Sequence, residues 1–151
     1  MSPVTITRRR SNLSRMVGET GGMTVLAALR GAARETAGLL EEGRTILAEA
    51  IAGLEAAAGG QRDAGWPDRV YAAARDVIEI CPPEAAALHR AAYSLCDLID
   101  LQLRLGRSDA PSVAVHVQAI RLLAAPDVSD AVATPILDGL SAVLERQAAS
   151  R

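Results

Sequence analysis

Apolar residues recur at alternating steps of three and four over most of this sequence, which is the spacing of one face of an α-helix. The longest such series runs through Leu26, Leu29, Ala33, Thr36, Leu40, Gly43, Leu47, Ala50, Leu54 and Ala57. No segment has the alternating pattern of a half-buried strand. The sequence therefore predicts an all-α fold, an antiparallel bundle of four or five helices.

Capping residues, prolines and glycines indicate where the helices begin and end. Thr24 has the side chain of an N-cap, and Gly59-Gly60 ends the first helix. The pair Pro82-Pro83 forces a turn, after which Pro83 starts the third helix. Pro67 is expected in the first turn of a second helix that runs to about Cys81, and Gly106 is expected to end the third helix. Ser108 or Asp109 is the expected cap of a fourth helix at about 110–124, with Pro111 in its first turn. Thr134-Pro135 is the expected start of the last helix.

Two helices pose a question of burial. An unbroken first helix would be about 50 Å long, so it either breaks near a glycine or extends past the bundle and pairs with a second copy. The glycines in question are Gly31, Gly38 and Gly43. The fourth helix has one apolar stripe at Val113, Val117, Ile120 and Ala124 and an opposite one at Val115, Ala119 and Leu122. We expect this helix to be buried on two sides, within the fold or by a partner.

Composition excludes several classes of function. The chain has 151 residues, half of them hydrophobic, which suffices for one domain with a real core. All 16 basic residues are arginines, so a Schiff-base lysine, a phosphate-loop lysine and a lysine general base are excluded. The net charge of −2 argues against a nucleic-acid partner. No apolar run approaches the roughly 18 residues of a membrane span, so we expect no membrane insertion.

Residues 1–23 differ from the rest of the chain. They carry four arginines against one acid and show no apolar period, and the charged residues are Arg8, Arg9, Arg10, Arg15 and Glu19. We interpret them as a flexible basic N-terminal tail ahead of a bundle domain at 24–148. The tail is either an ordinary disordered terminus or a docking segment for an acidic partner. Without a secretory signal, the expected location is the reducing cytoplasm, with free thiols at both cysteines.

The residue types that commonly act in catalysis or bind metals are not clustered in this sequence. Cys81 and Cys96 lie on or beside apolar faces, as small buried hydrophobes do. His116 lies among aliphatic residues, as a core histidine does, whereas His89 borders Tyr93 and could titrate near neutral pH or accept a phosphoryl group. There is no close-spaced pair of metal ligands and no glycine-rich phosphate loop. We therefore expect no metal, no cofactor and no catalytic residue, and we interpret the protein as not an enzyme.

Three strings of residues resemble those of signalling proteins. They are AAYSLCDLID at 91–100, VHVQAIRLL at 115–123 and GGMTV at 21–25. The first two resemble strings of histidine-phosphotransfer-like proteins, which are antiparallel four-helix bundles with an exposed phosphoacceptor histidine on the second helix. With the third string, the chain resembles the alphaproteobacterial chemotaxis family CheE. The resemblance covers about residues 67–124 and the short N-terminal string, and it implies a role in chemotaxis or another two-component phosphorelay.

The second helix departs from the phosphotransfer pattern at the acceptor position. Where the pattern A-H-x-[IL]-K-G would stand, the chain reads ARDVIE, with Arg75 at the histidine position. Since arginine cannot carry a phosphoryl group through such a relay, the resemblance implies a non-enzymatic adaptor that binds a response-regulator receiver domain or a histidine kinase. The residues expected to bind the partner, on the faces of helices two and three, are Arg75, Asp76, Glu79, His89, Arg90 and Tyr93.

Two alternatives stay open. The protein could be an active phosphotransfer protein that uses His89 or His116. It could instead be a structural helical module that forms a homodimer through the first-helix seam and the two-sided fourth helix.

Overall fold

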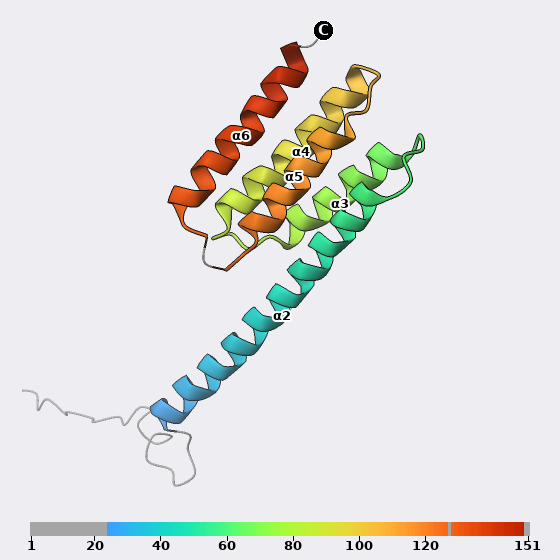
Figure 1. The fold of residues 1–151 in the computed structure, drawn as a ribbon. Helices are drawn as coiled ribbons and strands as arrows, with labels where there is room; N and C mark the ends of the chain where they lie inside the picture. The colour runs from blue at the N-terminus through green and yellow to red at the C-terminus, as the bar shows by residue number, and fades with distance from the viewer. Residues whose placement is uncertain (1–23, 127, 150–151) are drawn as a thin grey trace, which may run out of the picture. The chain divides into compact units, whose positions relative to one another are not determined.

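A computed structural model describes residues 24–126 and 128–149, which contain five helices. Figure 1 shows their arrangement. They are α2 (Val25–Gly59), α3 (Trp66–Ile80), α4 (Ala86–Arg104), α5 (Ala110–Leu123) and α6 (Asp130–Ala149). No strand occurs in these residues, so the expected all-α fold is confirmed. The described residues divide into two units, one up to residue 40 and one from residue 41 on. The expected basic tail at 1–23 lies outside the described residues and stays a prediction.

The first helix begins and ends where the sequence predicts. The Oγ1 atom of Thr24 accepts a hydrogen bond of 3.2 Å from the Ala27 N–H, so Thr24 is the N-cap. The helix then includes Gly31, Gly38 and Gly43 without a break. Each glycine costs about 1 kcal/mol relative to alanine inside a helix, and the many alanines and leucines around them offset that cost. Of the two alternatives for this helix, the continuous one is therefore correct.

The hydrophobic core lies in the second unit, with α4 at its centre. Helix α4 packs against α3, α5 and α6, and α5 packs against α6 (Figure 1). The C-terminal part of α2 adds Ile51 and Leu54 to this core. Residues expected to face inward on α3 and α4 are buried, among them Val70, Ala74, Val77, Leu88, Ala92, Leu95 and Ile99. Leu103, expected beside them, is about half exposed.

Helix α4, which corresponds to the third helix predicted from the sequence, does not begin at Pro83. The Ala85 N–H donates a hydrogen bond of 2.9 Å to the Pro82 carbonyl, and this bond closes a turn. Ala85 itself has a ψ of 51°, outside the helical range, so the turn and the helix are separate. Helix α4 therefore starts at Ala86, and the double proline belongs entirely to the connection.

The last helix, α6, begins at Asp130, about one turn earlier than the predicted start at Thr134. The Ser129 carbonyl accepts hydrogen bonds of 2.9 Å from two N–H groups of the first turn, and the Asp130 carboxylate favours the positive end of the helix dipole. Pro135 therefore lies inside the helix. As the sixth residue of α6 it cannot donate the usual hydrogen bond to the Ala131 carbonyl. Ala131 is exposed, so water can bond to this carbonyl instead.

Gly106 ends α4 as predicted. Its φ of 61° is in the left-handed region, which glycine adopts without the steric cost of a Cβ atom. The Gly106 N–H donates to the Leu103 carbonyl and the Arg107 N–H to the Gln102 carbonyl, each at 3.1 Å. These two bonds form a Schellman motif, which satisfies carbonyl groups at the end of the helix.

A polar cluster connects the start of α5 to α4 and α6. Asp109 caps α5, as predicted, by accepting a hydrogen bond of 3.4 Å from the Ser112 N–H. The buried amide of Gln102 bonds both backbone groups of Asp109, at 3.1 and 3.3 Å, and Gln147 of α6 donates to the Asp109 carboxylate. Hydrogen bonds, first of all that from the Ser112 hydroxyl, lower the pKa of Asp109.

Helix α5 is buried on one side within this chain. Its first stripe is in the core, with Val113, Val117 and Ile120 buried. Of the second stripe only Ala119 is buried, while Val115 and Leu122 are about half exposed. Within the described chain, α5 is therefore buried along its first stripe and not along its second.

Candidate functional site

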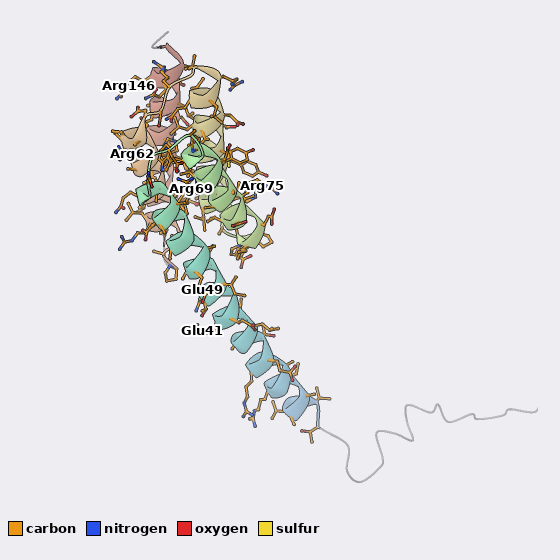
Figure 2. The ribbon with its side chains drawn as sticks, turned by 90° about the vertical axis from the view of Figure 1, so that its right-hand side faces the viewer. Glu41, Glu49, Arg62, Arg69, Arg75 and Arg146 are labelled. Atoms are coloured by element: carbon orange, nitrogen blue, oxygen red, sulfur yellow. The ribbon has the colours of Figure 1, made fainter. Side chains whose placement is uncertain are left out.

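Arg75 lies on the outer side of the hairpin formed by α3 and α4, which pack against each other (Figure 2). Its side chain is 61% exposed, and its Nη2 atom lies 2.9 Å from Glu79 Oε1, one turn further along α3. Such an exposed ion pair within one helix contributes little to stability. Arg75 can therefore exchange Glu79 for an acidic group of a partner at small cost.

His89 and Tyr93 form an aromatic pair on α4. Their ring centroids are 4.7 Å apart and the rings meet edge to face at 71°. Tyr93 is 50% exposed, and His89 is half-buried. Because the contact with His89 restricts the tyrosine ring, Tyr93 loses little rotamer freedom when a partner covers it.

Arg75 and Tyr93 lie at similar distances from the turn that connects α3 and α4. Counted from Ile80 and Ala86, the helix ends at this turn, Arg75 is about 8 Å along α3 and Tyr93 is about 10 Å along α4. Arg75 affects the pKa of the Cys96 thiol, which lies about one turn after Tyr93 on α4. Burial, and after it the negative charges of Asp100 and Asp97, raise the pKa of Cys96 to about 11, although the positive charge of Arg75 opposes them. The positive charge of Arg75 on α3 therefore acts on the Cys96 thiol of α4.

Arg75 and Glu79 on α3 and His89 and Tyr93 on α4 are all exposed or half-buried, and we call these four residues the hairpin surface. Asp76 and Arg90, also predicted for the site, are exposed as well. Successive residues of an α-helix lie about 100° apart around its axis. Asp76 therefore points about 100° away from Arg75 but only about 60° from Glu79. Arg90 points about 100° away from His89 but only about 60° from Tyr93. A partner that covers the hairpin surface would meet Asp76 and Arg90 at its edges.

His116 is a core histidine, as its pattern predicts. It is fully buried, its Nδ1 lies 2.9 Å from the Ser112 carbonyl and its Nε2 lies 3.1 Å from Ser94 Oγ. Since a carbonyl only accepts, Nδ1 carries the proton, and Nε2 accepts the hydrogen bond of the Ser94 hydroxyl. With both nitrogens occupied and no access from water, His116 is poorly placed to accept a phosphoryl group. The alternative of active phosphotransfer thus depends on His89.

Acid is expected to destabilise the protein through His116. Burial lowers the pKa of the folded imidazole from 6.5, although the hydrogen bond to Ser112 opposes this shift. Below about pH 6.5 the unfolded chain therefore binds more protons, so the free energy of unfolding falls as the pH falls. Urea unfolding at about pH 8 and about pH 5 measures this loss.

The variant His116→Gln is the control for this prediction. It is expected to be less stable than the wild type at about pH 8 but to lose less stability on going to about pH 5. Asp63 and Asp109, whose pKa values are lowered from 3.8 by hydrogen bonds to Arg69 and Ser112, lose their contributions only at lower pH. An equal loss in both proteins would show that His116 is not responsible.

Both cysteines are free, as expected. Burial raises the pKa of Cys81, and the negative charge of Glu84 raises it further. Because a thiolate is the reactive form, a raised pKa makes Cys81 and Cys96 poor nucleophiles. In residues 24–126 and 128–149 no three His, Cys, Asp or Glu side chains come together in a way that could hold a metal ion.

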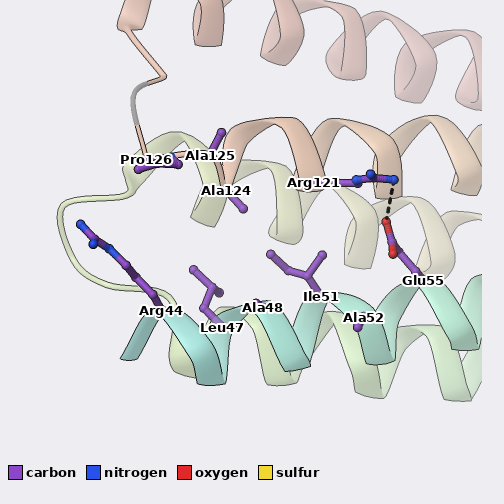
Figure 3. Close-up of a pocket in the computed structure, with 10 residues that line it drawn as sticks. All are labelled: Arg44, Leu47, Ala48, Ile51, Ala52, Glu55, Arg121, Ala124, Ala125 and Pro126. Carbon is purple, nitrogen blue, oxygen red and sulfur yellow. Dashed lines mark ion pairs between the residues drawn. The ribbon is translucent and has the colours of Figure 1, made fainter. Parts of the chain in front are cut away.

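Sequence patterns do not predict the groove between α2 and the end of α5 (Figure 3). Its volume is about 460 Å³, and Leu47 and Ile51 form an aliphatic floor. Arg121 Nη1 lies 3.5 Å from Glu55 Oε1 across it, and Arg44 lies at the other end (Figure 3). Periodicity places the aliphatic residues on one face of α2, but it does not tell which helix lies beside that face.

Comparison with protein-family models, with curated proteins and with solved structures gives no match for this chain. The described helices also include none that is both long enough and apolar enough to cross a lipid bilayer. The functional assignment therefore depends on the residues of the hairpin surface and on the resemblance of the sequence strings.

Proposed function

We propose that the protein is a non-enzymatic adaptor of chemotaxis or another two-component pathway in the cytoplasm. It binds a response-regulator receiver domain, or a histidine kinase, through the hairpin surface. The observation that supports this most is the exposed guanidinium of Arg75. In the proposed alignment it takes the place of the acceptor histidine of phosphotransfer domains, and short sequence strings in α4 and α5 resemble those of phosphotransfer-like proteins.

The chemistry of the hairpin surface suits such a partner. A guanidinium binds carboxylate and phosphoryl groups through two parallel hydrogen bonds, and it keeps its charge at every physiological pH. Arginine and tyrosine are the residues that most often supply binding energy at protein interfaces. Arg75 and Tyr93 are both at least half exposed on the two helices of the hairpin. Arg75 would pair with an acidic or phosphorylated site of the partner, and Tyr93 would bury its ring.

The test is a titration of the full chain with purified receiver domains and kinases of the same pathway. Each receiver is used in its phosphorylated and its unphosphorylated form, and binding is followed by calorimetry. We expect at least one partner to bind with a Kd in about the micromolar range, which is usual for transient signalling contacts. If no receiver and no kinase of the pathway binds, the adaptor proposal is wrong.

The second candidate is phosphotransfer through His89, which the half-buried position of His89 in the hairpin surface favours over transfer through His116. Incubation with a phosphorylated receiver distinguishes the two functions. An adaptor binds the receiver and acquires no acid-labile label. Label that appears on the wild type and is lost in His89→Gln would instead establish the transfer activity.

A further inference from the structure

The first part of α2 carries an apolar stripe that nothing in the described chain covers. Every residue from 24 to 46 is exposed except Gly31, which is half-buried. The large aliphatic side chains among residues 25–40 are 55–78% exposed, and they are Val25, Leu26, Leu29, Leu39 and Leu40. Since helices in proteins gain most of their stability by packing an apolar face, this stripe indicates a surface that a binding partner covers.

The stripe follows a heptad pattern in three adjacent rows. Row a holds Leu26, Ala33, Leu40 and Leu47, row d holds Leu29, Thr36, Gly43 and Ala50, and row g holds Val25, Ala32, Leu39 and Ile46. Further along, the same stripe is an interface already: Leu47 and Ala50 pack against the core of the second unit, and Leu54 is buried in it. The exposed part of the stripe thus continues, in the same register, an apolar helix interface that the protein itself forms.

Charged rows on both sides of the stripe distinguish a parallel from an antiparallel pair of these helices. Row e holds Arg30 and Arg44, and row c holds Glu35, Glu42 and Glu49. In a parallel, in-register pair of helices, row e of one lies beside row g of the other, with row c next to it. The arginines of each copy then approach the glutamates of the other. In an antiparallel pair, arginine rows would meet each other, and so would glutamate rows.

We propose that residues 25–46 of α2 bind the same segment of a second copy of this chain as a parallel, in-register coiled coil. Arg44 of each copy then lies beside Glu42 of the other. The small residues Ala33, Thr36 and Gly43 limit the apolar area that the pair buries, so the dimer is weak, with a Kd in about the micromolar range. The dimer does not depend on the proposed function, because it uses no residue of the hairpin surface. It would hold two hairpin surfaces and so bind clustered partners with higher avidity.

Sedimentation velocity of the full chain, over about two decades of concentration around the micromolar range, tests the pairing. The wild type is expected to pass from monomer to dimer. The variant Leu29→Glu/Leu40→Glu puts like charges opposite each other in the stripe, and we expect its Kd to rise at least about 100-fold. The matched control Ala27→Glu/Thr45→Glu adds the same charge at exposed positions on the opposite side of α2 and should dimerise like the wild type.

The direction of pairing has its own measurement. With Leu26→Cys, a parallel in-register pair brings the two new thiols together, so mild oxidation should give a covalent dimer. Thr45→Cys, on the opposite side of α2, should not. Cys81→Ala is included in both proteins, and the native Cys96 is buried with a raised pKa and so reacts slowly.

Three results would overturn the proposal. They are a wild type that stays monomeric throughout, a dimer that survives Leu29→Glu/Leu40→Glu, and equal weakening by the control pair. A dimer without the Leu26→Cys cross-link would overturn the parallel arrangement. Because receiver binding is measured separately, each of these results can occur whether or not the adaptor proposal holds.

Discussion

Trp66→Ala is expected to lower the free energy of unfolding by about 3–5 kcal/mol, the usual cost of removing a large buried aromatic side chain. Trp66 is 1% exposed and begins α3. Its Nε1 donates a hydrogen bond of 3.3 Å to the carbonyl of Ala58, near the end of α2. One side chain therefore joins the end of α2 to the start of α3. Urea unfolding followed by far-UV circular dichroism measures the change.

Trp66→Phe separates packing from the hydrogen bond. Phenylalanine keeps most of the aromatic volume but cannot donate to Ala58, so we expect a smaller loss, about 1–2 kcal/mol. A domain is commonly stable by only about 5–15 kcal/mol, so Trp66→Ala should also lower the melting temperature clearly. An alanine variant as stable as the wild type would mean that Trp66 is not packed in the core.

The second large effect is on binding. Arg75→Glu is expected to weaken receiver or kinase binding at least about 100-fold, because it removes the guanidinium and places a like charge against an acidic partner. The fold should not suffer, since Arg75 is exposed and its pair with Glu79 lies at the surface. Calorimetric titration gives the ratio of the Kd values, and circular dichroism verifies that the variant is folded.

Arg121→Glu is the matched control for Arg75→Glu. Arg121 is 63% exposed, close to the 61% of Arg75, and it also pairs with a glutamate. It lies on α5, outside the hairpin surface, so we expect less than about a twofold change in Kd. If both variants weaken binding equally, general charge attraction rather than the hairpin surface holds the partner.

Local signals predict several helix ends of this fold well. Thr24 and Asp109 cap helices through their side chains, and Gly106 ends one through its positive φ. Each of these acts within a few residues along the chain, so the sequence contains all that is needed. Periodicity likewise predicts buried residues such as Val77 and Ile99, because only one stripe of each helix is apolar.

Helix ends are predicted less well where a residue is compatible with more than one local conformation. Pro83 and Pro135 are both compatible with a first helical turn, yet one lies in a turn and the other inside α6. Helix α4 starts after Pro83 because a hydrogen-bonded turn forms at Pro82, and α6 starts before Pro135 because the Ser129 carbonyl accepts hydrogen bonds from its first turn. Periodicity also does not tell whether an apolar stripe is covered, and Leu122 of α5 is about half exposed for that reason.

The candidate site is predictable only in part. The 3.6-residue period correctly predicts that Arg75 and Tyr93 face outward. Their similar distances from the connecting turn depend on where α3 ends and α4 begins. How much of Asp76 a partner would meet depends on the rotation of α3 against α4. Contacts between residues far apart in sequence, such as Ser94 with His116, need the packed helices and are beyond any local pattern.

The most direct test of receiver docking is an NMR titration of the isotope-labelled full chain with the receiver that binds it. The adaptor account predicts that the largest shift changes lie on the hairpin surface, at Arg75, Glu79, His89 and Tyr93, with smaller changes at Asp76 and Arg90. Changes confined to the groove between α2 and α5, or to the outer side of α5 and α6, with the hairpin surface unaffected, would contradict it.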